Sequence, residues 1–368
     1  MLPKSITFVG FGLLASSMAM ALKTSETNTK IRVVSSPDTL KRAKELGLAD
    51  ECFTYDAVSL WGKNTNLILL CSPILHITEM LKQLMQITPE KEILVSDIGS
   101  TKEEICKIGK ELPSPYIFVG SHPMAGSEKH SLEFNDPSLF ENAYWFVCPE
   151  NSTKKETYEP LLDLIHFLGS HEVIFDAKTH DRTISFLSHM PQLLSSTLAA
   201  SIPEEISDNN YQHFAGRAFK DMTRIAASSW NMWQDILLTN KKSILDSLDI
   251  LSSHFNETIQ AVKRMERNDT SLIHSVFENG NKGRASLFSA KKNTGHYFEI
   301  TVPLQDKHGA VLSVIQPITN AGLQFREIEL MKIRENISGT LLIAFKTETE
   351  ANKAIEILKE KNIEAFVR

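Results

Sequence analysis

Short apolar runs alternate with amphipathic stretches along the first part of the chain. Apolar runs of strand length, separated by segments with helical spacing, are typical of parallel strands joined by helices. The expected strands are Ile6–Val9, Ile31–Val34, Leu67–Cys71, Ile93–Ser96, Ile117–Val119 and Tyr144–Cys148. Helical spacing lies between several of them, as in Leu40–Leu46 and Ile77–Gln86. This alternation predicts an α/β Rossmann-type domain, built from βαβ units around a parallel sheet with both faces covered.

The pattern changes near Ala177, where strand signals give way to helical ones. Thr179–Ile202 has continuous helical periodicity, Trp230–Arg267 predicts one or two more helices, and a polar loop is expected near Pro203–Asn210. We therefore expect an all-helical domain over residues 177–284, after a dinucleotide-binding domain over residues 1–176. A length of roughly 100 residues is common for a single domain.

The last part of the chain changes character again. Asn279–Gly283 contains two glycines and predicts a flexible junction. The segments after it read, in order, strand, helix, strand, strand, helix and strand: Tyr297–Leu304, Ala310–Ala321, Phe325–Arg334, Thr340–Phe345, Glu348–Lys361 and Ala365–Val367. The order βαββαβ predicts a ferredoxin-like domain over residues 293–368.

The N-terminal stretch ITFVGFGLLASSMAMALK allows two interpretations. Lys4, the apolar run and Ala19-Met20-Ala21 fit a cleaved secretion signal. Alternatively, a short strand is followed by Gly10, Gly12 and Ala15 in the pattern G-x-G-x-x-A, and then by a helix. That context is required of a dinucleotide-binding turn, in which Gly10, Gly12, Leu13 and Leu14 would approach a pyrophosphate.

Polar loops elsewhere in the first domain decide between these interpretations. Ser72-Pro73 follows the third expected strand, Asp97–Lys102 the fourth and Gly120–Pro123 the fifth. The carboxyl ends of parallel strands meet at one edge of a sheet, where ligands bind. Loss of the N-terminal stretch would remove the central strand, so the nucleotide site is the favoured interpretation.

Composition narrows the class of protein. The chain has 368 residues, a formal net charge of −6 and 23% charged residues, and this balance argues against a nucleic-acid partner. After the N-terminal stretch, no apolar run is long enough to span a bilayer. The four cysteines are scattered and form no C-x-x-C pair, which predicts neither a metal site nor a disulfide framework. Together these features favour a reducing, cytoplasmic location.

Two residues in the crevice loops are candidates for proton chemistry. His122, in GSHPMAGSE, would accept a hydroxyl proton as a neutral imidazole, or else cap the strand end by hydrogen bonds. Ser100, in DIGSTK, would hydrogen-bond a substrate hydroxyl, or else serve as the N-cap of a helix over residues 101–110.

The helical domain supplies four further candidates. Arg224 would bind a carboxylate with two hydrogen bonds, or else form an ion pair with Asp221. His189 would contact substrate or be a buried helix histidine with its own partners. Gln192 could bind a polar end of the substrate, and Trp233 is a substrate neighbour or a core aromatic.

The motifs GFGLLASS, CSP, DIGSTK, GSHPMAGSEKH, LFENAYW, HDRTISFLSHMP and FKDMTRIA, taken in order, resemble the prephenate/arogenate dehydrogenase family of tyrosine biosynthesis. The resemblance covers about the first 280 residues and implies oxidative decarboxylation of prephenate to 4-hydroxyphenylpyruvate with NAD or NADP. It implies that His122 takes the proton of the ring hydroxyl, that Ser100 binds the same hydroxyl, and that Arg224 binds a substrate carboxylate. It also implies Trp233 near the active site and an intertwined homodimer formed by the helical domain.

This chain departs from the family pattern at three places. Gln192 stands where relatives carry the second histidine of His-x-Pro-His, which leaves prephenate and arogenate open as substrates. Arg217-Ala218 replaces a usual Gly-Gly. Ser35-Ser36 ends the second strand without the acidic residue that binds the ribose of NAD. NAD and NADP therefore both stay open, with a slight preference for NADP.

The tail resembles an ACT domain, a module that binds amino acids. Asp306 and Gly309 precede its first helix and would contact an effector, for which L-tyrosine is the hypothesis. Three alternatives to a prephenate dehydrogenase are arogenate dehydrogenase, a non-catalytic amino-acid-sensing paralogue, and another dehydrogenase of the hydroxyacid type. The segments HPMAG and TRIA count against the last of these.

Overall fold

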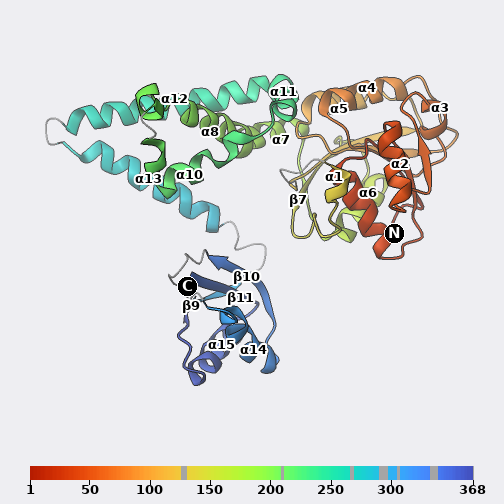
Figure 1. Ribbon diagram of the computed structural model, residues 1–368. Helices are drawn as coiled ribbons and strands as arrows, with labels where there is room; N and C mark the ends of the chain where they lie inside the picture. The colour runs from red at the N-terminus through yellow and green to blue at the C-terminus, as the bar shows by residue number, and fades with distance from the viewer. Residues whose placement is uncertain are drawn as a thin grey trace. The chain divides into compact units, whose positions relative to one another are not determined.

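A computed structural model describes residues 1–125, 131–208, 211–265, 269–289, 297–304, 307–331 and 339–367. The chain divides into two compact units, Met1–His254 and Phe255–Arg368. Figure 1 shows the α/β part and most of the helical part in the first unit, and a small mixed domain in the second.

The first unit is built on one eight-stranded sheet. Its order is β3-β2-β1-β4-β5-β6-β7-β8, so β1 lies in the interior with a parallel partner on each side. The strands are β1 Ser5–Val9, β2 Lys30–Val34, β3 Glu51–Phe53, β4 Leu67–Leu70, β5 Ile93–Asp97, β6 Tyr116–Pro123, β7 Tyr144–Cys148 and β8 His171–Ile174. The Rossmann-type prediction is confirmed, since a doubly wound sheet of this order places β1 and β4 on either side of its crossover point.

Two features of the sheet differ from the prediction. The strands β3 and β8 were not expected, because the segments ECF and HEVI are short and carry charged residues among apolar ones. The pairing of β6 with β7 is antiparallel, whereas all other neighbours in this sheet are parallel. An antiparallel strand near the edge of an otherwise parallel sheet is common in large α/β domains.

Helices cover both faces of the sheet. They are α1 Leu13–Thr24, α2 Pro37–Glu45, α3 Val58–Trp61, α4 Ile74–Leu84, α5 Glu103–Gly109 and α6 Lys155–Phe167. One apolar cluster joins α1 and α6 to the sheet, and a second joins α3 and α4 to its other face. Strands whose side chains are buried on both faces read as continuous apolar runs, which is why the sequence pattern located them.

The helical region starts with one nearly continuous helix. It comprises α7 Ala177–Ile184, a π-helical turn η2 Ser185–His189, and α8 Met190–Ala200. The next elements are α9 Glu204–Asp208, η3 Tyr211–Phe214, α10 Arg217–Thr223, η4 Arg224–Ala227, α11 Trp230–Thr239, α12 Lys241–Arg264 and α13 Ser271–Ser289.

Two sequence predictions for this region were wrong. Residues 204–208 form a short helix rather than a loop, because Glu204 and Glu205 complement the dipole in its first turn. Asn279–Gly283 lies inside α13 and is not a junction. Two glycines lower helix propensity by only about 2 kcal/mol together, which the surrounding helix formers outweigh.

The tail has the predicted ferredoxin-like topology. Its sheet order is β10-β11-β9-β12, and all its strand pairs are antiparallel. The elements are β9 Phe298–Leu304, α14 Ala310–Asn320, β10 Phe325–Met331, β11 Gly339–Phe345, α15 Glu348–Glu360 and β12 Phe366–Val367. Both helices pack with the sheet around one apolar cluster. The predicted end of the third segment, residues 332–334, lies outside the described residues.

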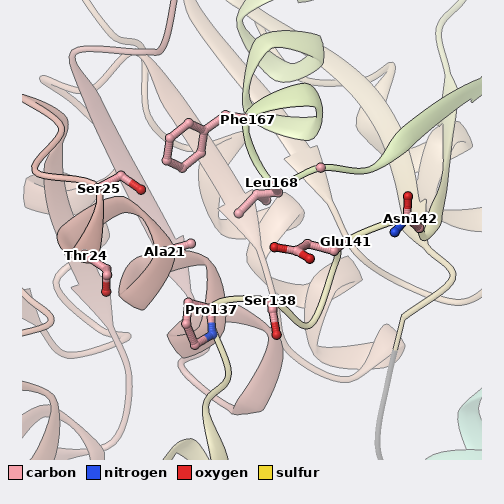
Figure 2. Close-up of a pocket in the computed structure, with 10 residues that line it drawn as sticks. Ala21, Thr24, Ser25, Pro137, Ser138, Glu141, Asn142, Phe167 and Leu168 are labelled. Carbon is pink, nitrogen blue, oxygen red and sulfur yellow. The ribbon is translucent and has the colours of Figure 1, made fainter. Parts of the chain in front are cut away.

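One hollow in the first unit lies away from the glycine turn and from the loops that follow β4, β5 and β6. It measures about 430 Å³ and lies where α1 and α6 end. Figure 2 shows Glu141 reaching toward α1, with Ser138, Leu168 and Phe167 around the hollow. The C-terminus of α1 belongs to the edge of the sheet opposite the carboxyl end of β1, so this hollow is separate from the predicted crevice.

Candidate active site

Two hollows lie at the carboxyl ends of the strands and share a wall. The larger measures about 530 Å³ and the smaller about 330 Å³, and Gly12, Cys71, Ser72 and Pro73 line both. The larger is also lined by Leu13, Leu14, Ile74, Ile98, Gly99, Ser100, His122, Pro123, Ala125, Ser229, Asn231, Met232, Asp235 and Ile236. The predicted crevice therefore exists, and α11 of the helical region forms one of its walls.

The turn between β1 and α1 has the geometry of a phosphate site. Gly10 has φ +89°, and a Cβ there would lie 2.9 Å from backbone atoms of Cys71 and Ser72. Gly12 is the N-cap residue of α1 and supplies no side-chain cap. Its helix N-terminus keeps backbone N–H groups available for an anion.

The wall after β4 offers a hydrogen-bonding group of its own. Ser72 Oγ is buried and has no hydrogen-bond partner within the described chain. A buried polar atom of this kind needs a partner, which a bound ligand can supply. Together with the glycine turn, it shows that these residues fit a dinucleotide.

The smaller hollow lies at the end of β2. Ser35, Thr39, Tyr55, His76 and Ser131 are among its lining residues, and none of the described residues lining it is acidic. Ser35 is buried and takes the position of the carboxylate that usually binds a ribose.

The sequence predicted that His122 follows the end of its strand, but the residue lies inside β6. Gly120, two residues before it, has no positive φ; a Cβ there would lie 2.5 Å from Cys106 Sγ, so packing is the reason for that glycine. The strand continues through Pro123 because residues 120–123 pair with β7. This pairing holds the His122 backbone against β7, beyond the point where β5 stops pairing with β6.

A chain of hydrogen bonds runs behind His122. Its Nδ1 lies 2.9 Å from Nε2 of His180, and His180 Nδ1 lies 2.8 Å from Oδ1 of Asp181. The Asp181 carboxylate accepts, so we assign the His180 proton to Nδ1. His180 Nε2 then accepts from His122 Nδ1. This tautomer leaves Nε2 of His122 as the unprotonated nitrogen available to the crevice.

Burial keeps these imidazoles neutral. The pKa of His122 is well below its usual 6.5 because of burial first, and then because of repulsion by His180, Lys102 and His189. Burial also lowers the pKa of His180, although Asp181 opposes this shift. A neutral His122 is ready to accept a proton near neutral pH.

Asp181 also fixes the loop that carries Ser100. Its carboxylate accepts from the backbone N–H of Lys102 at 2.7 Å and of Glu103 at 2.9 Å, and so caps α5. The alternative of Ser100 as N-cap was therefore wrong, because the helix starts at Glu103 and Asp181 caps it. Ser100 is half-buried and lines the larger hollow with His122.

A buried ion pair holds the same loop from below. Lys102 and Asp97 are fully buried and form a salt bridge, and Lys102 Nζ donates to the Ser121 carbonyl at 2.7 Å. This ties the loop after β5 to the strand that carries His122. Sequence reasoning missed His180, Asp181 and Lys102, although each stands in a quoted motif, HDRTISFLSHMP or DIGSTK.

Two family models match this chain one after the other. The family model for "Prephenate dehydrogenase, nucleotide-binding domain" matches residues 18–174, and that for "Prephenate dehydrogenase, dimerization domain" matches residues 176–278. A prephenate dehydrogenase of Lactococcus lactis subsp. cremoris is 31% identical over 364 residues, covering 97% of this chain and 98% of that relative. The chain belongs to the prephenate dehydrogenase family. It is an NAD(P)-dependent dehydrogenase.

Two further relatives agree with this assignment. The prephenate dehydrogenase of Bacillus subtilis (strain 168) is 29% identical over 367 residues, covering 97% of this chain and 96% of the relative. A crystal structure of prephenate dehydrogenase from A. aeolicus, in complex with hydroxyphenyl propionate and NAD+, has a TM-score of 0.67 and 26% identity. The match covers 77% of this chain and 98% of the A. aeolicus chain.

Three of the predicted substrate residues of this prephenate dehydrogenase family member lie behind the crevice and do not line it. His189 is 1% exposed, and its Nδ1 lies 3.2 Å from the side-chain amide of Asn240. Trp233 meets the His189 ring edge to face at 5.8 Å, and its Nε1 is buried without a partner in the described chain. Burial lowers the pKa of His189 to about 4.

Gln192 is the third of these residues, and its amide is already engaged. Its Nε2 donates to the Ile225 carbonyl at 2.8 Å, and its Oε1 accepts from Ser228 Oγ at 3.2 Å. Gln192 thus joins α8 to the turn that begins with Arg224.

Arg224 begins η4, is exposed, and is not among the residues lining the larger hollow. Its predicted ion-pair partner, Asp221, forms a salt bridge with Arg217 at 3.3 Å. In the tail, Gly309 has φ +81° and is the N-cap residue of α14, while Asp306 lies outside the described residues.

Proposed function

We propose that this chain oxidises and decarboxylates prephenate to 4-hydroxyphenylpyruvate, the family reaction of tyrosine biosynthesis, with His122 as the base. The observation that carries this proposal is the His122–His180–Asp181 chain, which presents an unprotonated Nε2 to the crevice beside Ser100. A prephenate dehydrogenase needs such an acceptor for the ring hydroxyl, whereas an amino-acid sensor does not.

The proton path follows from the tautomers. Ser100 Oγ hydrogen-bonds the ring hydroxyl and orients it, and His122 Nε2 takes the hydroxyl proton. The imidazolium that forms donates from Nδ1 to His180, which Asp181 holds in the accepting tautomer. A nicotinamide held in the crevice would supply the acceptor for the hydride that leaves the ring carbon carrying the hydroxyl. Loss of the ring carboxylate as CO2 makes the ring aromatic, and the phenolate oxygen takes the proton back from His122 Nε2 to give the hydroxyl of the product.

The crevice residues are proposed to hold the cofactor and exclude water from it. The turn at Gly10, Gly12, Leu13 and Leu14 would carry the pyrophosphate. Ser72 and Pro73 would contact the nicotinamide half, and Ser35 the adenosine ribose. Because none of the described residues lining the ribose end is acidic, we propose a slight preference for NADP over NAD.

The far end of the substrate is proposed to meet the helical region. Arg224 would bind a side-chain carboxylate, and Gln192 would hold its turn through Ile225 and Ser228. Trp233 lies on α11 between residues that line the crevice, and His189 packs against its ring, so both would shape the crevice wall without touching the substrate. A neutral glutamine stands where relatives carry the second histidine of His-x-Pro-His, which keeps arogenate as the second candidate substrate.

We also propose a homodimer formed through the helical domain, residues 177–284. Several large apolar side chains of α11 and α12 are exposed, including Trp230 at 63%, Leu238 at 60% and Leu245 at 49%. Trp230, Leu238 and Leu245 line one apolar groove of about 650 Å³. Exposed apolar surface of this extent marks an interaction site.

The tail is proposed to bind an effector, and the protein is proposed to be cytoplasmic. Residues 293–368 would bind L-tyrosine near Gly309, whose φ permits close approach of a ligand to a helix start. The described cysteines are all free thiols, in keeping with a cytoplasmic location. No described helix is long and apolar enough to cross a membrane.

The test of the proposed function is a grid of four assays at the reduced-nicotinamide absorbance band. Prephenate and arogenate are each combined with NAD and with NADP. Turnover is expected with prephenate, and His122→Asn should reduce kcat by roughly 10²–10⁴-fold, the usual contribution of a general base. A folded wild type without turnover in all four assays would contradict the proposal.

A further inference from the structure

The wall formed by α11 is attached to the first domain by apolar packing and by two polar contacts. Ile236 is 5% exposed and belongs to the apolar cluster that contains Ile74 and Ile77 of α4. Figure 1 shows α11 beside α4 at the end of the α/β part. Burial of Ile236 holds the helix against the first domain. One polar contact before Ile236 and one after it decide where α11 meets the crevice.

The first polar contact lies at the N-terminus of α4. Pro73 is the N-cap residue of this helix and offers no side-chain acceptor. The missing acceptor comes from Asp235, whose Oδ2 accepts from the Leu75 backbone N–H at 3.1 Å. Asp235 is 160 residues away in sequence, and it lines the larger hollow together with Ser72, Pro73 and Ile74.

The second polar contact lies one helical turn further along α11. Thr239 Oγ1 donates to the Asp235 carbonyl at 2.8 Å, so its hydroxyl proton is used within the helix. Thr101 Oγ1 lies 2.8 Å from Thr239 Oγ1 and is therefore the donor between them. Thr101 is the residue after Ser100, so this contact ties α11 to the loop proposed to bind the substrate hydroxyl.

We infer that α11 clamps the crevice at two points with separate effects: Asp235 positions the cofactor wall and Thr239 positions the substrate loop. The inference rests on the proposed function for the identity of the two ligands. Asp235 acts through α4 and is a positioning residue. Without its cap, the first turn of α4 loses an acceptor, and the Ser72-Pro73 wall directly before it loses its anchor to α11. Without the Thr239 hydroxyl, the loop at Ser100 loses its anchor instead.

The binding of reduced cofactor tests the Asp235 half without any turnover. Quenching of tryptophan fluorescence by NADH and by NADPH gives Kd for the wild type, Asp235→Ala and Asp235→Asn. Loss of a helix cap has an effect of about 0.5–2 kcal/mol, so Asp235→Ala should raise Kd roughly 2- to 30-fold. Asn keeps an acceptor oxygen, so Asp235→Asn should restore most of the affinity that alanine loses.

Glu79→Ala is the matched control for this measurement. It removes an exposed acid from α4 without touching the cap, and its Kd should equal that of the wild type. An Asp235→Ala protein with wild-type Kd would overturn the inference, and so would an Asp235→Asn protein as weak as Asp235→Ala. The second outcome would mean that the charge acts directly and that the acceptor is irrelevant.

Thr239→Val tests the other half, since valine keeps the shape of the side chain and removes the hydroxyl. We expect it to raise KM for the substrate and leave Kd for NADH unchanged, whereas Asp235→Ala should do the reverse. Equal changes in both constants for both variants would show general loosening and would overturn the two-point clamp. If the wild type binds NADH but turns over no substrate, the proposed function fails, and the Kd comparison still decides the role of Asp235.

Discussion

The tautomer of His122 is decided by a residue that never reaches the crevice. His180 lies at 0% exposure behind it, and the two rings meet edge to face at 5.1 Å. A lone buried histidine could present either nitrogen, and only the accepting Nε2 of His180 selects one. The proposed base is therefore a property of three side chains, His122, His180 and Asp181.

Replacing His180 by leucine tests this dependence. His180→Leu leaves Nδ1 of His122 without an acceptor, so the useful tautomer is no longer selected. We expect kcat to fall about 10- to 100-fold, by analogy with the loss of a partner that orients a metal-bound histidine. KM for the substrate should change little, because His180 does not line the crevice. His171→Leu, at an exposed histidine of β8, is the control and should keep wild-type kcat.

The choice between NAD and NADP is also expected to depend on a single residue, Ser35. Ser35→Asp restores a carboxylate at the end of β2, where it would accept hydrogen bonds from the ribose of NAD and repel the 2′-phosphate of NADP. The ratio of kcat/KM for NADP to that for NAD should fall at least about tenfold, which corresponds to 1.4 kcal/mol. Ser36→Asp, at the exposed neighbour, is the matched control. An unchanged ratio in Ser35→Asp would place the ribose elsewhere.

At the scale of elements, α13 shows how local signals mislead. Gly280 and Gly283 are exposed on this helix, and a Cβ at either would meet nothing within 4 Å. Alanine is favoured over glycine in a helix interior by roughly 1 kcal/mol. We therefore expect Gly280→Ala and Gly283→Ala each to raise the free energy of unfolding by about that amount.

Urea denaturation followed by circular dichroism would measure this gain. Gly309→Ala is the contrasting variant, because its φ of +81° is strained for any residue with a Cβ. That change should lower stability while the two helix changes raise it. A loss of stability in Gly280→Ala would mean that residues 279–283 are not helical in solution.

The π-helical turn η2 is the element that supplies His189. Five residues, Ser185–His189, widen the helix between α7 and α8. Such turns are frequent at functional sites because they shift the faces of the helix on either side. His180 and His189 both reach the network around Asp181, since Asn240 Nδ2 donates to the Asp181 carbonyl at 2.8 Å and contacts His189.

At the scale of the whole molecule, the buried histidines make stability depend on pH. Burial lowers the pKa of His122, His180 and His189 in the folded chain, whereas the unfolded chain titrates near 6.5. Below about pH 6.5 the unfolded state binds more protons, so stability falls with falling pH. Above about pH 7.5 the histidines are neutral in both states and contribute no slope.

The free energy of unfolding should therefore be flat above about pH 7.5 and should decrease from there toward pH 5. His189 alone, with its pKa of about 4 in the folded state, contributes a decrease on the order of 3 kcal/mol by the time both states are protonated. His189→Asn should make the acid limb shallower, and His274→Asn, at an exposed histidine, should leave it as steep. A free energy of unfolding that increases as the pH falls from 6.5 to 5 would contradict the assignment of neutral buried histidines.

The sequence by itself determined the architecture. The apolar runs located six of the eight strands of the first sheet, because strands buried on both faces must be apolar throughout. The spacing of Gly10 and Gly12 placed the phosphate turn, since the backbone there needs a positive φ and a free helix start. Loops at strand ends placed Ser72, Ser100 and His122 in one crevice, because parallel strands all end at the same edge.

Only the tertiary structure decided how the site works. His180 lies 58 residues from His122 in sequence, and Asp235 lies 160 residues from the helix that it caps. A polar side chain in a helical pattern carries no local sign of its partner, because hydrogen bonds between distant segments depend on how the helices pack. For the same reason, the sequence could not show that Asp181 caps α5 in place of Ser100. Nor could it show that the side-chain amide of Gln192 donates to the turn that begins with Arg224.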